Sequence, residues 1–207
     1  MQIDKGLYKL LLLPVVYSFF RRFISSKSKL DSFVNGYVSP FEKCKILDIG
    51  CGPAKILEYY PKNIEYVGID INENYIKNAR DTYGGDKRTF LCGTVDDINN
   101  QEFSQFDIIT CLGVLHHLDD NQIKQLVKNF SKLLKPTGHI VTLDNCYVNG
   151  QNPISKFLIA HDRGKNVRTP EEYDTFFNPY FAVKGTKCNL CRIPYDHYII
   201  VAKHKNA

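Results

Sequence analysis

The sequence lacks a long hydrophobic run. Its main apolar stretch is residues 7–20, LYKLLLLPVVYSFF, which Lys9 and Pro14 interrupt and which Arg21 and Arg22 follow. A helix that crosses a bilayer needs about 20 apolar residues, so this stretch is too short to span one. No small-residue cleavage site follows it, which argues against a secretory signal.

Outside its first 30 residues, the sequence also lacks an excess of positive charge. Of 27 Lys and Arg and 22 Asp and Glu, residues 1–30 hold six basic side chains and only Asp4, so the other 177 residues carry 21 charges of each sign. Such a neutral domain is not expected to bind a polyanion over its whole face, so no nucleic-acid partner is expected. We expect residues 1–38 to form a helical cap or lid and residues 39–207 to form one domain. The alternatives for residues 7–29 are peripheral contact with an anionic membrane surface and a dimer contact.

Cysteine usage does not indicate a disulfide framework. The chain has seven cysteines, an odd number, and most lie in apolar runs such as 108–111. Reduced thiols are typical of an intracellular protein. We therefore expect a cytoplasmic protein, either free in the cytoplasm or peripheral at the inner membrane surface.

Strands and helices alternate from residue 43 onward. The expected strands are continuous apolar runs at 45–49, 66–69, 89–92, 106–112 and 139–143. The expected helices cover 53–60, 72–82 and 119–134, where Pro136-Thr-Gly138 stops the last one, and a further helix is expected to start at Thr169-Pro170. This order, with unbroken apolar strands, predicts an α/β fold with a parallel sheet covered on both faces. Residues 181–188 and 195–203 are expected to add an antiparallel hairpin at the sheet edge.

A glycine turn follows the first expected strand. In Asp48-Ile-Gly50-Cys51-Gly52, Gly50 permits a tight turn and Gly52 allows a ligand to approach the backbone. Asp70 ends the second strand, 20 positions after Gly50, where a carboxylate can bind a ribose diol. Lys55 occupies the place of the third glycine of a dinucleotide site, which argues against NAD. Asp48 suits an ammonium group better than a pyrophosphate. S-adenosylmethionine combines a ribose, an ammonium and a carboxylate with no phosphate.

At this point the chain resembles the class I S-adenosylmethionine-dependent methyltransferases. The resemblance covers about residues 45–205 and rests on ILDIGCGPAKIL, YVGIDIN, FDIITCLGVLHHLDD and LLKPTGHIVTLD, in this order. It implies a Rossmann-like, doubly wound, mostly parallel seven-stranded sheet with an antiparallel C-terminal strand. Two later stretches, HDRGKNVRTPEEY and CRIPYDH, resemble a bacterial subgroup that methylates small molecules.

The resemblance also implies roles for single residues in binding the cofactor. The methionine end would lie on Asp48, Gly50, Cys51 and Gly52, and the ribose on Asp70 beside Ile71. The adenine would lie on the loop 93–97, through Thr94, through Val95, or through Asp96 in place of the Asp that the family often has at Thr94. Leu112 would lie near the methyl group. Ala54 stands where the family more often has glycine.

The methyl acceptor is expected beyond the carboxyl ends of the fourth and fifth strands. A hydroxyl or amine acceptor needs a base, for which His117, His116 and His197 are the candidates; each could equally be a structural histidine. Arg163, Arg168 and Arg192 could clamp an anionic acceptor, or they could be solvated or paired. The candidates for binding the acceptor are Asp144, Asn145, Arg163, Arg192 and Tyr195.

No metal site is expected. Cys188-x-x-Cys191 with His197 and His204 suggests zinc, but two histidines seven positions apart on one strand point to opposite faces. The pair Asp144-Asn145 suits magnesium, yet Cys111 and Leu112 stand where a third carboxylate would be needed. We therefore predict a methyltransferase for a small molecule or a glycan or lipid precursor, with transfer to O or N. The alternatives are a nucleic-acid or protein methyltransferase, or a cofactor-binding protein without turnover.

Overall fold

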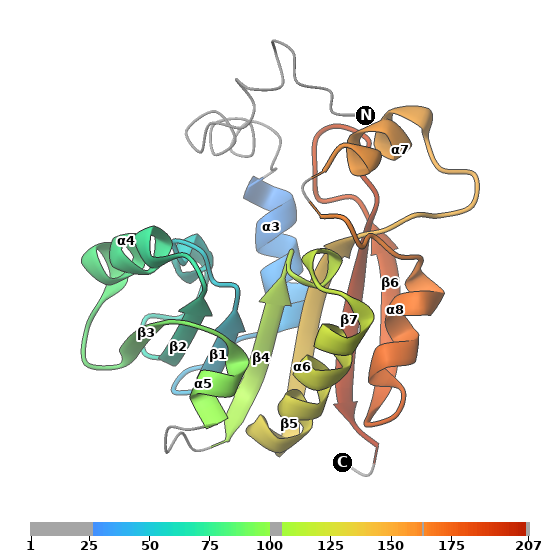
Figure 1. The fold of residues 1–207 in the computed structure, drawn as a ribbon. Helices are drawn as coiled ribbons and strands as arrows, with labels where there is room; N and C mark the ends of the chain where they lie inside the picture. The colour runs from blue at the N-terminus through green and yellow to red at the C-terminus, as the bar shows by residue number, and fades with distance from the viewer. Residues whose placement is uncertain (1–26, 100–104, 163, 206–207) are drawn as a thin grey trace.

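The computed structural model describes residues 27–99, 105–162 and 164–205. Its strands run β1 (Lys45–Ile49), β2 (Glu65–Asp70), β3 (Arg88–Cys92), β4 (Phe106–Leu112), β5 (Leu134–Asn145), β6 (Phe181–Cys188) and β7 (His197–His204). They form one seven-stranded sheet in the order β3-β2-β1-β4-β5-β7-β6. Strands β1 to β5 pair in parallel, and β7 is antiparallel to both β5 and β6. The predicted fold class is therefore confirmed (Figure 1).

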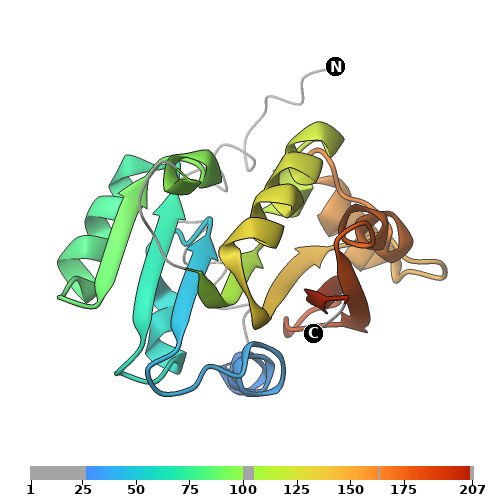
Figure 2. The ribbon, with the colours of Figure 1, turned by 90° about the horizontal axis from the view of Figure 1, so that it is seen from below.

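Helices cover the two faces of the sheet. They are α3 (Lys27–Phe33), the π-helical turn η1 (Val34–Val38), the 3-10 helices η2 (Lys55–Tyr59) and η3 (Leu115–His117), α4 (Glu73–Tyr83), α5 (Val95–Asn99), α6 (Asp120–Leu133), α7 (Pro153–Ala160) and α8 (Pro170–Phe177). Figure 2 shows α3 and α6 on opposite faces of the sheet. Within the described residues no helix is long and apolar enough to cross a membrane.

Alternate residues of each strand bury their side chains on opposite faces. Leu47 of β1 belongs to the apolar core beneath α5, α6 and α8, whereas its neighbour Ile46 belongs to the core beneath α3, η1 and α4. This double-sided burial is why the strands are continuous apolar runs in the sequence. Because both faces of the sheet are covered, a site can form only at the loops that follow the ends of the strands.

Residues before β1 belong partly to this second core. Phe33, Val34 and Val38 are almost completely buried there, and the Nε2 atom of His139 lies 3.0 Å from the Val38 carbonyl oxygen. Residues 33–38 therefore pack on the sheet. The rest of the cap that was predicted for residues 1–38 includes residues 1–26, which lie outside the described residues.

The structure differs from the expected elements at two places. The chain enters β5 at Leu134, directly after α6, so the helix stop predicted at 136–138 falls inside the strand. The register between β4 and β5 shifts there, which accommodates Pro136 without a ladder hydrogen bond. The helix expected at 53–60 is the shorter η2. The antiparallel hairpin of β6 and β7 lies at one edge of the sheet, as expected, with β7 next to β5 and β6 outermost.

Candidate active site

The glycine turn after β1 is tied to the end of β2. The amides of Gly50 and Cys51 both donate to the carbonyl oxygen of Ile69, at 2.8 and 3.0 Å. Gly50 has a φ of 68°, and a Cβ atom there would overlap the side chain of Val114. Gly52 has a φ of 53°, and no atom lies within 4 Å of where its Cβ would be. The turn therefore leaves open space beside the backbone of Gly52.

Asp70 connects this turn to the segment after β2. Its two carboxylate oxygens accept from the backbone amides of Gly52, at 2.9 Å, and Asn72, at 2.8 Å. The next residue, Ile71, is 80% exposed although it is large and apolar. The carboxylate can accept hydrogen bonds from a ribose, and the exposed apolar side chain beside it can cover an adenine ring, as predicted. These ligand contacts stay predictions.

Asp48 lies beneath the turn rather than on its surface. Its side chain is buried, and its two oxygens accept from the hydroxyl groups of Tyr66, at 2.6 Å, and Thr110, at 2.7 Å. Burial raises the pKa of Asp48 to about 6, although both hydrogen bonds act against the rise. Asp48 thus joins β1 to β2 and β4. The contact with an ammonium group predicted for it stays a prediction, and in this structure both of its oxygens already have partners.

The loop after β3 has its own internal contacts. The amide of Thr94 donates to Asp97 at 2.7 Å, and Val95 is buried. Asp96 accepts from the side chain of Asn129 on α6 at 2.8 Å, so an adenine contact through Asp96 would have to replace this bond. Leu112, at the end of β4, is half-buried.

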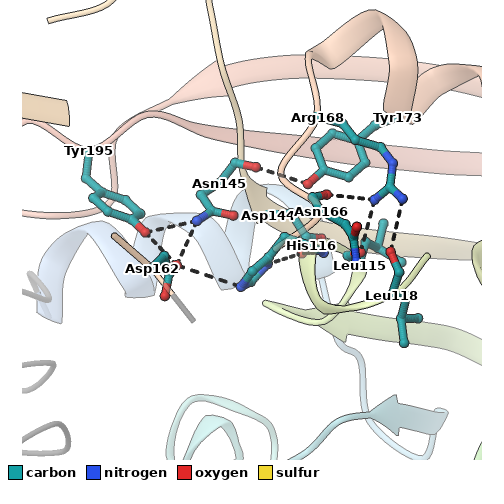
Figure 3. A network of polar contacts seen from close by, with 10 residues as sticks. All are labelled: Leu115, His116, Leu118, Asp144, Asn145, Asp162, Asn166, Arg168, Tyr173 and Tyr195. Carbon is teal, nitrogen blue, oxygen red and sulfur yellow. Dashed lines mark hydrogen bonds and ion pairs between the residues drawn. The ribbon is translucent and has the colours of Figure 1, made fainter. Parts of the chain in front are cut away.

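The polar centre of the acceptor side is the pair His116–Asp144 (Figure 3). One oxygen of Asp144, at the end of β5, accepts from the backbone amide of His116 at 3.2 Å and lies 2.8 Å from its Nδ1 atom. Both side chains are buried. Because a carboxylate only accepts hydrogen bonds, Nδ1 carries the proton, and the neutral ring presents its lone pair at Nε2.

A second carboxylate faces the other side of this imidazole. The Oδ2 atom of Asp162 lies 3.8 Å from Nε2 of His116, and it accepts from the amide of Asn145 at 2.7 Å and the hydroxyl of Tyr195 at 2.8 Å. Burial is the largest influence on the pKa of His116 and lowers it. The bond and the charge of Asp144, together with the charge of Asp162, outweigh burial, so the pKa is raised.

His197 has the opposite character. It lies opposite Asn145 in the β5–β7 register, and burial lowers its pKa to about 4. A nitrogen with so low a pKa is a weak base near neutral pH, which disfavours His197 as the catalytic base. Its Nδ1, the second oxygen of Asp144 and the amide oxygen of Asn145 have no hydrogen-bond partner among the described residues.

The predicted arginines do not form an anion clamp in the described residues. Arg163 lies outside them, and Arg192 is exposed. Arg168 is a structural residue, since its guanidinium donates to the carbonyl oxygens of Leu115 and Leu118 and to Asp120. It therefore holds the loop that carries His116. His117 is exposed, with its ring centroid 4.1 Å from that of His116.

Sequence reasoning missed two features of this region. Helix α7 was not expected, although Asn152 followed by Pro153 is a standard helix start and Asn152 caps it. The function of Arg168 as a scaffold for η3 had no local signal, because its partners lie about 50 residues away. No group of three or more His, Cys, Asp and Glu in the described ranges is arranged to hold a metal ion.

Known proteins that resemble this chain include methyltransferases, which agrees with the geometry of the glycine turn. Residues 47–140 match the family model of a methyltransferase domain. A ubiquinone biosynthesis O-methyltransferase of Idiomarina loihiensis is 31% identical over 111 residues, which are 52% of this chain and 45% of the relative. One of Coxiella burnetii is 32% identical over 98 residues, 46% of this chain and 41% of the relative. The aligned region thus spans less than half the length of these curated relatives.

Solved structures share the fold. An S-adenosylmethionine-dependent methyltransferase of Archaeoglobus fulgidus has a TM-score of 0.70 at 21% identity, covering 90% of this chain and 99% of its own. The pyocyanin biosynthetic protein PhzM has a TM-score of 0.69 at 18% identity, covering 98% and 62%. Residues 47–140 thus match a methyltransferase domain, and the strand order and these likenesses show that the chain has the fold of the class I S-adenosylmethionine-dependent methyltransferases.

Proposed function

We propose that this protein transfers a methyl group from S-adenosylmethionine to a hydroxyl group of a small molecule. The observation that carries the proposal is the buried His116–Asp144 pair at the carboxyl ends of β4 and β5, because a hydroxyl acceptor must lose a proton to a base. The names of the curated relatives, O-methyltransferases of ubiquinone biosynthesis, support an O-acceptor. They give no support to a nucleic-acid or protein acceptor, or to a protein without turnover.

The residues around the glycine turn fit the cofactor. The open space at Gly52 admits a ligand against the backbone, and the Asp70 carboxylate lies at the same turn, where two ribose hydroxyls could replace or join its backbone donors. Exposed Ile71 supplies an apolar surface for the adenine. Bound S-adenosylmethionine supplies an activated methyl group on a sulfonium.

The residues of the acceptor side supply the proton transfer. Asp144 holds the Nδ1 proton of His116, so the lone pair of the neutral imidazole lies at Nε2, which faces Asp162. The acceptor hydroxyl would give its proton to Nε2 while its oxygen bonds to the methyl carbon and the bond from that carbon to the sulfonium sulfur breaks, so that S-adenosylhomocysteine is the leaving group. The imidazolium that forms is stabilised by the carboxylates of Asp144 and Asp162. Tyr195 and Asn145 hold Asp162 in place for this step.

The segment before the described residues carries a separate proposal. Residues 7–20 are apolar and basic residues flank them, so we propose that they form a cover over the acceptor side. Peripheral contact with an anionic membrane surface is the competing proposal for the same residues. An acceptor that is a lipid precursor would favour the second.

Replacing Asp70 by alanine should weaken the binding of S-adenosylmethionine roughly tenfold to a hundredfold, because a charged acceptor for the ribose hydroxyls is lost. Isothermal titration calorimetry measures the effect. Asp81→Ala, an exposed carboxylate on α4, is the matched control and should bind as the wild type does. Equal affinity in both variants would show that the assigned cofactor site is wrong.

Replacing His116 by glutamine should lower turnover of a hydroxyl acceptor by about 10²–10⁴-fold, with little change in cofactor affinity, because the base is lost. Formation of S-adenosylhomocysteine in a screen of hydroxylated metabolites measures turnover. His204→Gln, at the opposite end of the sheet, should keep full activity. If His116→Gln is as active as the wild type, the acceptor needs no base from this residue.

Replacing Asp144 by asparagine should lower the pKa of His116, since burial then acts with less opposing charge. Proton NMR of the imidazole Cε1–H against pH measures it, with Asp107→Asn at the far end of β4 as a control.

The same substitution of Asp144 should change how the stability of the fold depends on pH. In the wild type the pKa of His116 is raised on folding. The stabilisation that His116 contributes is therefore complete below the unfolded pKa of about 6.5 and is lost as pH rises through the folded pKa. Asp144→Asn should therefore reduce the free energy of unfolding more at pH 6 than at pH 9, and an equal loss at both would contradict the linkage.

Deleting residues 1–25 should reduce acceptor turnover in solution while leaving cofactor affinity unchanged, if these residues cover the acceptor. Turnover assays and sedimentation with anionic phospholipid vesicles are run on both chain lengths. The full chain without vesicles is the reference. Loss of vesicle binding alone, with turnover intact, would instead favour the membrane proposal.

A further inference from the structure

The loop between β6 and β7 forms one wall of the acceptor side. It carries Tyr195, whose hydroxyl donates to Asp162, and Asp196. Asp196 accepts from the side chains of Ser155, at 2.6 Å, and Gln151, at 2.9 Å, so this end of the loop is fastened to α7 and the segment before it. Ser155 is fully buried and anchors Asp196, whereas Tyr195 lies on the side of this anchor that faces the rest of the loop.

The other end of the loop has its own internal order. The side chain of Asn189 accepts from the amide of Cys191 at 2.7 Å and donates to the carbonyl oxygen of Ile193 at 2.8 Å. These bonds shape the loop locally. Leu190 packs against the core beneath α3, and the polar attachment of this end comes from another element.

Lys29 supplies that contact from α3. Its ammonium group donates to the carbonyl oxygens of Asn189, at 3.0 Å, and Cys191, at 2.8 Å, across 160 and 162 positions of sequence. Both bonds have a charged donor, which strengthens them relative to neutral ones. Lys27, two positions earlier on the same helix, has no hydrogen bond to this loop within the described part of the chain. In Figure 1, α3 begins at the end of the sheet where α7 lies.

We propose that Lys29 is a positioning residue for the methyl transfer, acting through the β6–β7 loop on Tyr195, Asp162 and finally His116. This inference rests on the proposed function, because it assigns a role in preparing the same base. Within the described part of the chain, Tyr195 and Asn145 donate to the oxygen of Asp162 that faces His116. A displaced loop withdraws one of them, which frees Asp162 to turn away from the imidazole.

The surroundings of His116 make this displacement measurable. It is faced by Asp144 from β5, Asp162 from the connection between α7 and α8, the ring of His117 from η3 and His197 from β7. Two of these neighbours contact Tyr195 of the loop that Lys29 binds: Asp162 accepts from its hydroxyl, and the ring of His197 lies 5.0 Å from its ring. Asp162 is the one that carries a negative charge, so a change at Lys29 is expected to alter the pKa of His116 mainly through this carboxylate.

The test compares Lys29→Met with Lys29→Arg and Lys27→Met in the full-length protein. Lys29→Met should speed hydrogen exchange of the Cys191 amide by roughly fivefold and lower the pKa of His116 in NMR titrations. It should also raise KM for a hydroxyl acceptor by roughly fivefold, with cofactor affinity unchanged. Lys29→Arg keeps a cation that can bind two carbonyl groups and should restore most of each effect. Lys27→Met should behave as the wild type.

An unchanged Cys191 exchange rate and an unchanged His116 pKa in Lys29→Met would overturn the inference, and neither measurement needs an acceptor. Equal effects of Lys27→Met and Lys29→Met would overturn it too, because they would reflect lost surface charge. If the wild type turns over no hydroxyl acceptor while Lys29→Met still shifts both NMR readouts, the proposed function fails and the positioning of His116 stands. Lys29 is exposed, so folding should be retained, as circular dichroism can check.

Discussion

The carboxylate of Asp144 is the contact on which the acceptor side depends. One of its oxygens accepts from both the backbone and the ring of His116, so it fastens the loop after β4 to the end of β5 and fixes which imidazole nitrogen carries the proton. Parallel strands that end at the same sheet edge make this possible. A buried carboxylate with a buried imidazole is costly unless the two are paired, and this cost holds the geometry in place.

Two other carboxylates, Asp48 and Asp70, hold the glycine turn on the cofactor side. Asp48 is buried and joins β1 to its two neighbours through Tyr66 and Thr110. Asp70 then fastens the glycine turn to the segment after β2. The turn is therefore supported from below by one carboxylate and from the side by another. These two carboxylates hold the turn in place, so the backbone at Gly52 can remain accessible to a ligand although glycine has no side chain that could stabilise the turn.

The sequence predicted those features that depend on local patterns. Continuous apolar runs gave the parallel strands, and Thr169 with Glu172 forms the helix start expected there. Features set by distant partners were not predictable in the same way. Arg168 was a candidate for binding an acceptor, yet it binds carbonyl groups about 50 residues earlier in the chain. His116 and Asp144 were both candidates, but their pairing depends on the relative height of two strand ends, which no local pattern specifies.

Among the described residues, the charges at the acceptor side fit the proposed hydroxyl acceptor better than an anionic one. An anionic acceptor would need cations, whereas the described side chains around Nε2 of His116 are Asp162, Asn145 and Tyr195. Arg168 directs its guanidinium toward η3 and Asp120 instead. A carboxylate or phosphate next to two carboxylates would be repelled, while a hydroxyl can donate to either of them. The same two carboxylates that disfavour an anion would stabilise the imidazolium that the proposed deprotonation of the hydroxyl forms.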